Sequence, residues 1–203
     1  MFQNIPPLTR TVLFINVLVF LAMGVFGNGL INTFALWPWS TLPEYGDAPG
    51  FQVWQIITYS FLHGSFTHLF FNMFALYLFG SELERLFGER RFFQLYFASV
   101  IAAALAQLVF SAAMGGEPYP TVGASGGVFG LLLAFAWCFP NRQIVLLIPP
   151  IPMPAWLFVT LYGGLELILG VTGTQEGVAH FAHLGGMLGA WILLRYWRGR
   201  NWR

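Results

Sequence analysis

Residues 122–140 read VGASGGVFGLLLAFAWCFP, and this stretch decides the expected fold. It contains no charged residue, and about 20 mostly apolar residues are enough to cross the hydrocarbon core of a bilayer as a helix. Near Ser125 there are two pairs of glycines in which the members are four residues apart: Gly123 with Gly127, and Gly126 with Gly130. Small residues at this spacing, which recur as Gly185 and Gly189 in the last apolar stretch, allow the backbones of these two membrane helices to approach closely. The stretch therefore predicts a membrane helix, packed tightly against a neighbour, with a serine near its start.

The composition of the whole chain supports the same class. Of the 203 residues, 57% are hydrophobic and only 8% are charged, whereas a soluble globular chain carries about 25% charged residues. Six stretches are apolar enough to be spans, at about residues 9–27, 67–83, 92–114, 122–140, 153–172 and 178–197. We therefore expect an all-α membrane protein with a single domain over residues 1–203, built as a bundle of six transmembrane helices.

The charged residues predict how these spans are oriented. With six spans, all nine basic residues fall on the side shared by both termini: Arg10, Arg85, Arg90, Arg91, Arg142, Arg195, Arg198, Arg200 and Arg203. The opposite side carries only acidic residues, namely Glu44, Asp47, Glu117 and Glu176. Because cytoplasmic loops hold an excess of Lys and Arg, both termini are predicted to be cytoplasmic. The net charge of +1 gives no indication of nucleic-acid binding.

Two connections between the spans have a distinctive composition. The long first connection, residues 28–66, combines turn residues with Trp37, Trp39 and Trp54. Tryptophan is enriched where a chain meets the membrane–water interface, so we expect short interfacial helices there. Residues 144–156 contain four prolines, which cannot continue an unbroken helix. That stretch is predicted to be a cytoplasmic connector.

Polar residues collect at the outer ends of three expected spans. His68 and Asn72 lie in the first turns of the second span, Ser125 begins the fourth, and His180 and His183 begin the sixth. A serine hydroxyl becomes a strong nucleophile when a neutral imidazole within hydrogen-bond reach takes its proton. Each feature alone is more often explained by packing. Their joint placement at one depth favours an acyl-transfer site.

At this point the chain resembles the rhomboid family of intramembrane serine proteases from about residue 51 to 197. The motifs that carry the resemblance are HGSFTHLFFN at 63–72, ERLFG at 84–88, GASG at 123–126 and AHLGG at 182–186. The family fold is a bundle of six transmembrane helices with a long, partly interfacial first loop.

The resemblance implies roles for individual residues. Ser125 attacks the scissile carbonyl and His183 acts as general base and then acid, as a dyad without an acidic third member. The supporting residues that it implies are His68, Asn72 and the Ser125 backbone N–H as oxyanion donors, His63 as a support for the outer rim of the site, and Gly123, Gly126 and Gly186 for close packing. Phe129 stands where a tyrosine that stacks on the catalytic imidazole is frequent. His180 is expected at the water boundary.

Family membership also implies partners and location. Substrates would be single transmembrane segments that reach the site sideways between spans two and five and are cut near their outer end. A loop at 171–178, with Gly173 and Gly177, would roof the site. The implied location is a bacterial inner membrane, with the site open to the outer side, and no particular oligomeric state is implied. The family often has Trp-Arg where this chain has Trp54-Gln55, which leaves the anchoring of the first loop open.

Three further interpretations complete the sequence-based expectations. Glu166 in the fifth span belongs to no family motif, so we expect a hydrogen-bonded or cavity-facing side chain and little effect of Glu166→Gln, within about threefold. No metal or other cofactor is expected, because the four histidines lack HExxH spacing. The alternative functions are a rhomboid-like binder of transmembrane helices without protease activity and a transporter or channel.

Overall fold

A computed structural model describes residues 5–39, 49–114, 119–145, 150–172 and 179–199. Its elements, in chain order, are α1 (Pro7–Phe26), α2 (Asn28–Phe34), α3 (Gln55–Thr58), the 3-10 turn η3 (Tyr59–Phe61), α4 (Phe66–Ala75), the π-helical segment η4 (Leu76–Gly80), α5 (Ser81–Phe87), α6 (Glu89–Met114), α7 (Ser125–Cys138), β1 (Gln143–Val145), β2 (Pro152–Pro154), α8 (Ala155–Thr172) and α9 (His180–Gly199).

Helices occupy all six of the predicted spans. Among the described residues, α1, α6 and α8 are long and apolar enough to cross a membrane, and α7 is a shorter apolar helix of 14 residues. The second predicted span is helical from α4 through η4 to α5. The number of membrane crossings therefore stays a prediction, while the mainly helical class is confirmed.

The proline-rich connector contains the one departure from an all-α chain among the described residues. Strands β1 and β2 pair antiparallel, with Gln143 opposite Pro154 and Val145 opposite Pro152. Proline fixes φ in a range compatible with extended backbone and lacks the N–H that a helix interior uses. The sequence predicted that the helix would stop here, but it did not predict the strand pairing.

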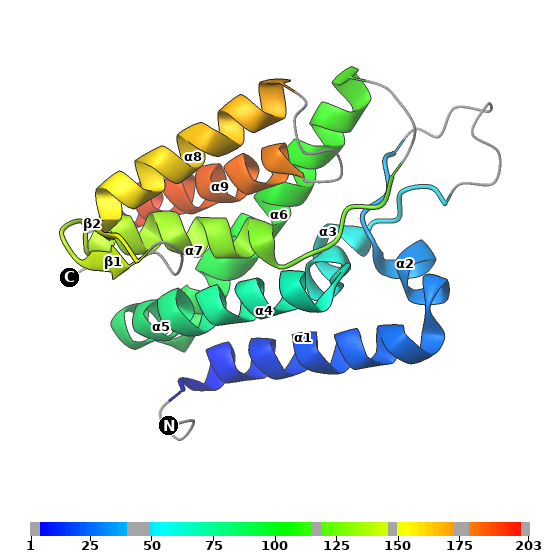
Figure 1. Cartoon of the computed structure of the whole chain (residues 1–203), viewed down its shortest axis with the longest axis horizontal. Helices are drawn as coiled ribbons and strands as arrows, with labels where there is room; N and C mark the ends of the chain where they lie inside the picture. Colours follow the sequence, from blue (N-terminus) through cyan, green and yellow to red (C-terminus); the bar gives the residue numbers. More distant parts are fainter. Residues whose placement is uncertain (1–4, 40–48, 115–118, 146–149, 173–178, 200–203) are drawn as a thin grey trace.

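Helix α9 packs against α6, α7 and α8 (Figure 1). Helix α1 runs along the opposite face, beside α4 and η4. The start of α1 and the end of α9 lie at the same end of the bundle in Figure 1. Helix α7 begins near the middle of the molecule in Figure 1, where the coil segment before it ends.

Glycines set the distances between the central helices. A Cβ on Gly186 of α9 would meet the backbone carbonyl of Gly126 on α7, so the two helices touch through their backbones. Gly130 of α7 packs against Ser99 of α6 and also lies close to the Gly186 carbonyl. Close approach of α7 and α9 was expected, but the expected role of a second glycine pair in it was wrong.

That second pair, Gly185 and Gly189, packs against α6 instead. A Cβ at Gly185 would meet Ala106, and one at Gly189 would meet Ala102. Residues 185 and 186 are adjacent on a helix and so point about 100° apart, which the spacing of glycines alone does not resolve. Helix α9 is consequently in backbone-level contact with two helices at once.

The first loop is anchored by Gln55, which is fully buried. Its side-chain oxygen accepts hydrogen bonds from the backbone N–H groups of Trp37 at 3.2 Å and Gln52 at 3.1 Å. Its amide nitrogen donates to the Thr33 carbonyl at 3.3 Å. Trp54 adds a bond from its indole N–H to the same carbonyl, at 2.9 Å. The Trp54-Gln55 pair therefore does anchor the loop.

The anchored loop in turn holds the segment that leads into α7. Leu36 and Thr121 exchange two backbone hydrogen bonds, at 3.0 and 2.9 Å. Next to this bridge, the Gly123 N–H donates to the Tyr59 carbonyl at 3.0 Å. Three backbone bonds thus fix the approach to Ser125.

Glu84 joins the ends of two helices. Its carboxylate accepts hydrogen bonds from the backbone N–H groups of Leu8 at 2.9 Å and Thr9 at 2.7 Å, and from the Thr9 hydroxyl at 2.7 Å. The first N–H groups of a helix have no partner inside it, and a carboxylate there also complements the helix dipole. Glu84 therefore fixes the start of α1 against α5.

We expect Gln55→Ala to lower the free energy of unfolding by about 2–3 kcal/mol, because buried backbone groups lose their partners. Thermal unfolding of the purified protein in detergent measures this change. Gln52→Ala is the matched control, since the exposed Gln52 side chain is not needed for the bond from its backbone N–H. Equal midpoints for the two variants would contradict the anchoring role.

We expect Gly186→Ala to separate α7 from α9, because the new methyl group meets backbone that cannot rotate away. Overpacking of this kind costs about 1–3 kcal/mol or more. The thermal midpoint in detergent should therefore fall. Gly164→Ala is the control, because open space surrounds Gly164. A Gly186→Ala midpoint equal to that of the control would show that the two backbones are not in tight contact.

Candidate active site

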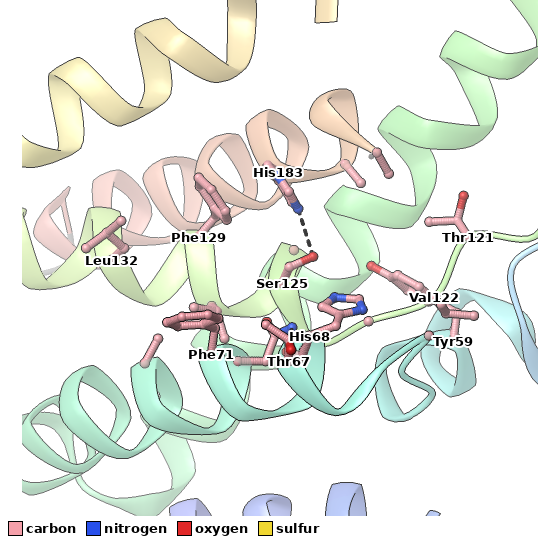
Figure 2. Close-up of a pocket in the computed structure, with 18 of the residues that line it drawn as sticks. Tyr59, Thr67, His68, Phe71, Thr121, Val122, Ser125, Phe129, Leu132 and His183 are labelled. Carbon is pink, nitrogen blue, oxygen red and sulfur yellow. Dashed lines mark hydrogen bonds between the residues drawn. The ribbon is translucent and has the colours of Figure 1, made fainter. Parts of the chain in front are cut away.

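Ser125 and His183 lie within hydrogen-bond distance of each other. Ser125 is the first residue of α7 and His183 lies in the first turn of α9. The Ser125 hydroxyl oxygen and His183 Nε2 are 2.8 Å apart, as Figure 2 shows. As the first residue of a helix, Ser125 also has a backbone N–H with no acceptor inside that helix. The structure thus brings a hydroxyl, an imidazole and a backbone donor together.

Phe129 stacks on the face of the His183 ring. Their rings are stacked with centroids 4.2 Å apart and an interplanar angle of 7°. Phe129 follows Ser125 by one helical turn, so the same helix carries the serine and the stacking ring. Tyr162 of α8 packs beside Phe129, with ring centroids 5.1 Å apart. The imidazole is therefore confined in orientation by contacts from α7.

His68 lies against the segment just before Ser125 (Figure 2). Ser65 caps α4 by accepting a hydrogen bond from the His68 N–H at 3.1 Å, which fixes the first turn of that helix. A Cβ at position 123 would lie 2.7 Å from Cε1 and Nε2 of the His68 ring, which is too close for two atoms that are not bonded. Gly123 also has a φ angle of +127°, which residues other than glycine rarely adopt. Glycine is required at position 123 for both reasons.

Asn72 follows His68 by one turn and faces the same cavity. Its side chain is 6% exposed, and its amide nitrogen donates to the His68 carbonyl at 3.0 Å. The amide carries a second N–H. His68, Asn72 and Ser125 all line the cavity, so the structure places these three predicted residues around one space.

His63, which is expected to support the outer rim of the site, packs against His68. It is 1% exposed and packs edge-to-face on His68, with ring centroids 4.9 Å apart. Burial, together with the nearby His68, lowers the pKa of His63 to about 4, partly offset by the Phe61 backbone. His63 is therefore a neutral ring behind His68.

Glu166 is a partner of the site that the sequence did not assign. Its Oε2 atom lies 2.8 Å from His183 Nδ1 and 2.7 Å from His180 Nδ1. The resemblance implies a dyad without an acidic third member, whereas in this structure an acidic side chain contacts the expected base. His180 is 5% exposed, so its expected place at the water boundary is wrong. It turns inward because the buried carboxylate supplies an acceptor.

A cavity of about 680 Å³ opens beside Ser125. Apolar side chains from two helices line it on either side: Phe71, Phe74, Ala75 and Phe79 from α4 and η4, and Phe158 and Tyr162 from α8. Ser125, His68 and His183 also line this cavity. The roof loop and its two glycines, Gly173 and Gly177, lie outside the described residues.

Comparison with known proteins agrees with the motifs. Residues 50–199 match the Rhomboid domain. The chain is 31% identical to the mitochondrial Rhomboid protein 1 of Saccharomyces cerevisiae, with 93% of this chain and 55% of that protein aligned. It is 31% identical to the rhomboid protease GluP of Bacillus subtilis, over 94% of this chain and 35% of GluP.

A third relative is the rhomboid protease GlpG of Yersinia pestis, at 27% identity over 96% of this chain and 64% of GlpG. The chain thus spans between about a third and two thirds of the length of these relatives. The Rhomboid match covers most of the chain, including every residue of the cavity. Together with the apolar helices, it shows that this integral membrane protein belongs to the rhomboid family.

Proposed function

We propose that this protein is an intramembrane serine endopeptidase with Ser125 as nucleophile and His183 as general base. The observation that carries the proposal is the distance of 2.8 Å between the Ser125 hydroxyl oxygen and His183 Nε2. A general base must lie within about 2.6–3.2 Å of the group whose proton it takes. Two of the relatives, GluP and GlpG, bear the name rhomboid protease.

The reaction follows from the positions of these groups. Ser125 Oγ attacks the scissile carbonyl while its proton passes to Nε2 of His183, which then gives the proton to the leaving amine. A water molecule, deprotonated by the same imidazole, hydrolyses the acyl-enzyme and frees the serine. The proposed reaction uses only protein groups and water.

The oxyanion of the tetrahedral intermediate needs donors already in place. The Ser125 backbone N–H, the second N–H of the Asn72 amide and the His68 imidazole are the candidates that line the cavity. Each is fixed before substrate arrives: Ser125 by the helix start, Asn72 by its bond to the His68 carbonyl and His68 by packing on Gly123. Preorganised donors cost no rearrangement during the reaction.

The substrate class is proposed to be a single transmembrane segment. The apolar sides of the cavity are formed by α4 and α8, and such walls suit a helix from the lipid better than a soluble peptide. Access between these two helices leads to the serine. We further propose six membrane crossings, both termini in the cytoplasm, and a site that opens to the outer side of a bacterial inner membrane.

We expect purified wild-type protein to cut a transmembrane reporter that carries small residues near its outer end. Ser125→Ala should lose this cleavage, because removal of a catalytic serine costs roughly 10⁶ in turnover in a serine protease. Mass spectrometry of the fragments locates the bond. Ser111→Ala, on α6 and away from the cavity, is the matched control and should cut at the wild-type rate.

Two other outcomes would reject the proposal. Equal cleavage by wild type and Ser125→Ala would remove Ser125 from the mechanism. Binding of several reporters without any cleavage would favour the non-proteolytic helix binder, in which the same cavity only holds a transmembrane segment.

A further inference from the structure

The fifth predicted span carries a single acidic side chain that is directed at the proposed catalytic base. Glu166 lies in α8 and is 5% exposed. A buried carboxylate is costly unless it is paired or hydrogen-bonded. Here one oxygen atom, Oε2, contacts Nδ1 of both His183 and His180, at 2.8 and 2.7 Å. The two histidines lie on α9, so this cluster also joins α8 to α9.

The contact to Ser125 determines which nitrogen of His183 can carry a proton. Nε2 of His183 must be free of hydrogen to accept the serine proton, and a neutral imidazole has one N–H. The hydrogen is then on Nδ1, which donates to Glu166 Oε2. The opposite tautomer would turn a lone pair toward a carboxylate oxygen at 2.8 Å, which is repulsive. An ionised Glu166 thus selects the tautomer that the reaction needs.

His180 has the same relation to the carboxylate. Its Nδ1–H can donate to Oε2, whereas its Nε2 is buried without a hydrogen-bond partner among the described residues. Two N–H donors from one helix therefore converge on one oxygen and hold it in place. Among the described residues, the other titratable groups that face the cluster are Tyr162 of α8, which interacts with Glu166, and His68 of α4, which interacts with His183.

The same three side chains could be considered as metal ligands, since their donor atoms all lie within 4.8 Å of one another. The contacts at 2.7 and 2.8 Å argue against that use. Two ligand atoms each about 2.0–2.1 Å from a tetrahedral zinc ion are separated by about 3.3 Å. The observed separations are those of charge-assisted hydrogen bonds.

We propose that Glu166 is a positioning residue for the proposed protease reaction: it fixes the tautomer and orientation of His183 and stabilises the imidazolium that forms when Ser125 gives up its proton. His180 holds the carboxylate in that position. The inference rests on the proposed function, because it assumes that His183 is the base. It replaces the sequence-based expectation that loss of the Glu166 charge has little effect.

Glu166→Gln tests this inference, because it keeps the shape of the side chain and removes the charge. We expect kcat for the transmembrane reporter to fall about 10²–10⁴-fold, as when the carboxylate of a Ser-His-Asp triad becomes an amide. KM should stay within about twofold, since Glu166 is not among the residues that line the cavity. Glu166→Asp, which restores the carboxylate one methylene shorter, should recover part of the loss.

A second readout needs no transmembrane substrate. A fluorophosphonate probe reacts with a serine that is activated by its base, so its labelling rate at Ser125 should fall in Glu166→Gln and partly recover in Glu166→Asp. Thr160→Val, in the same helix but exposed and bonded only to its own helix, is the matched control. Thermal unfolding of each variant separates loss of fold from loss of activation. If Glu166→Gln does not fold, the labelling rate of Glu166→Asp is compared with that of wild type. A rate equal to that of wild type would contradict the positioning role of Glu166.

The outcomes separate this inference from the proposed function. If wild type cleaves and labels while Glu166→Gln does both within threefold, the positioning role is wrong and the protease stands. Labelling without cleavage, still dependent on Glu166, supports the positioning role although the reporter substrate class is wrong. If the wild-type protein is neither labelled nor able to cleave the reporter, both proposals are rejected. Loss of wild-type labelling on addition of EDTA would assign the cluster to a metal instead.

Discussion

The backbone contact between Gly126 and Gly186 is the constraint on which the site depends. It brings α7 and α9 closer than any side chain would permit. Ser125 stands next to Gly126, and His183 stands one turn before Gly186. The separation of the two helix axes therefore sets the distance between the hydroxyl and the imidazole. A methyl group at this contact would change the reacting geometry although it touches neither of the two reacting groups.

Further contacts hold α9 and the start of α7 in the positions that this backbone contact requires. Helix α9 is held on its other side by the small residues of α6, so it cannot move back from α7. On the α7 side, the Leu36–Thr121 bridge and the Gly123 N–H fix the chain before Ser125. These bonds depend on a first loop that is itself held by Gln55. An amide suits this position because its oxygen and nitrogen each take a backbone partner of opposite kind.

The sequence predicted the helical regions and most of the polar cluster, because hydropathy and depth are properties of single segments. Ser125, His68, Asn72 and His183 do line or reach one cavity. It did not predict the rotation of each helix about its axis. For that reason the partner of Gly185 was assigned to α7 rather than α6, and His180 to water rather than to Glu166. The pairing of β1 with β2 and the bonds from Glu166 to the two histidines of α9 join separate segments of the chain, which no local pattern contains.

The hydrogen-bond partners of Glu166 explain why an acidic side chain is tolerated in an apolar helix. A carboxylate in an apolar helix loses hydration that only partners can replace, and two histidine N–H groups on the adjacent helix supply them. The histidines in turn need an acceptor, since a buried imidazole N–H without one is also destabilising. Charge and donors thus stabilise each other, and the arrangement leaves one nitrogen of His183 to face Ser125. A group that satisfies the fold and directs the base by the same bonds cannot be assigned to packing or to chemistry alone, which is why variants that keep shape but change charge are the informative ones.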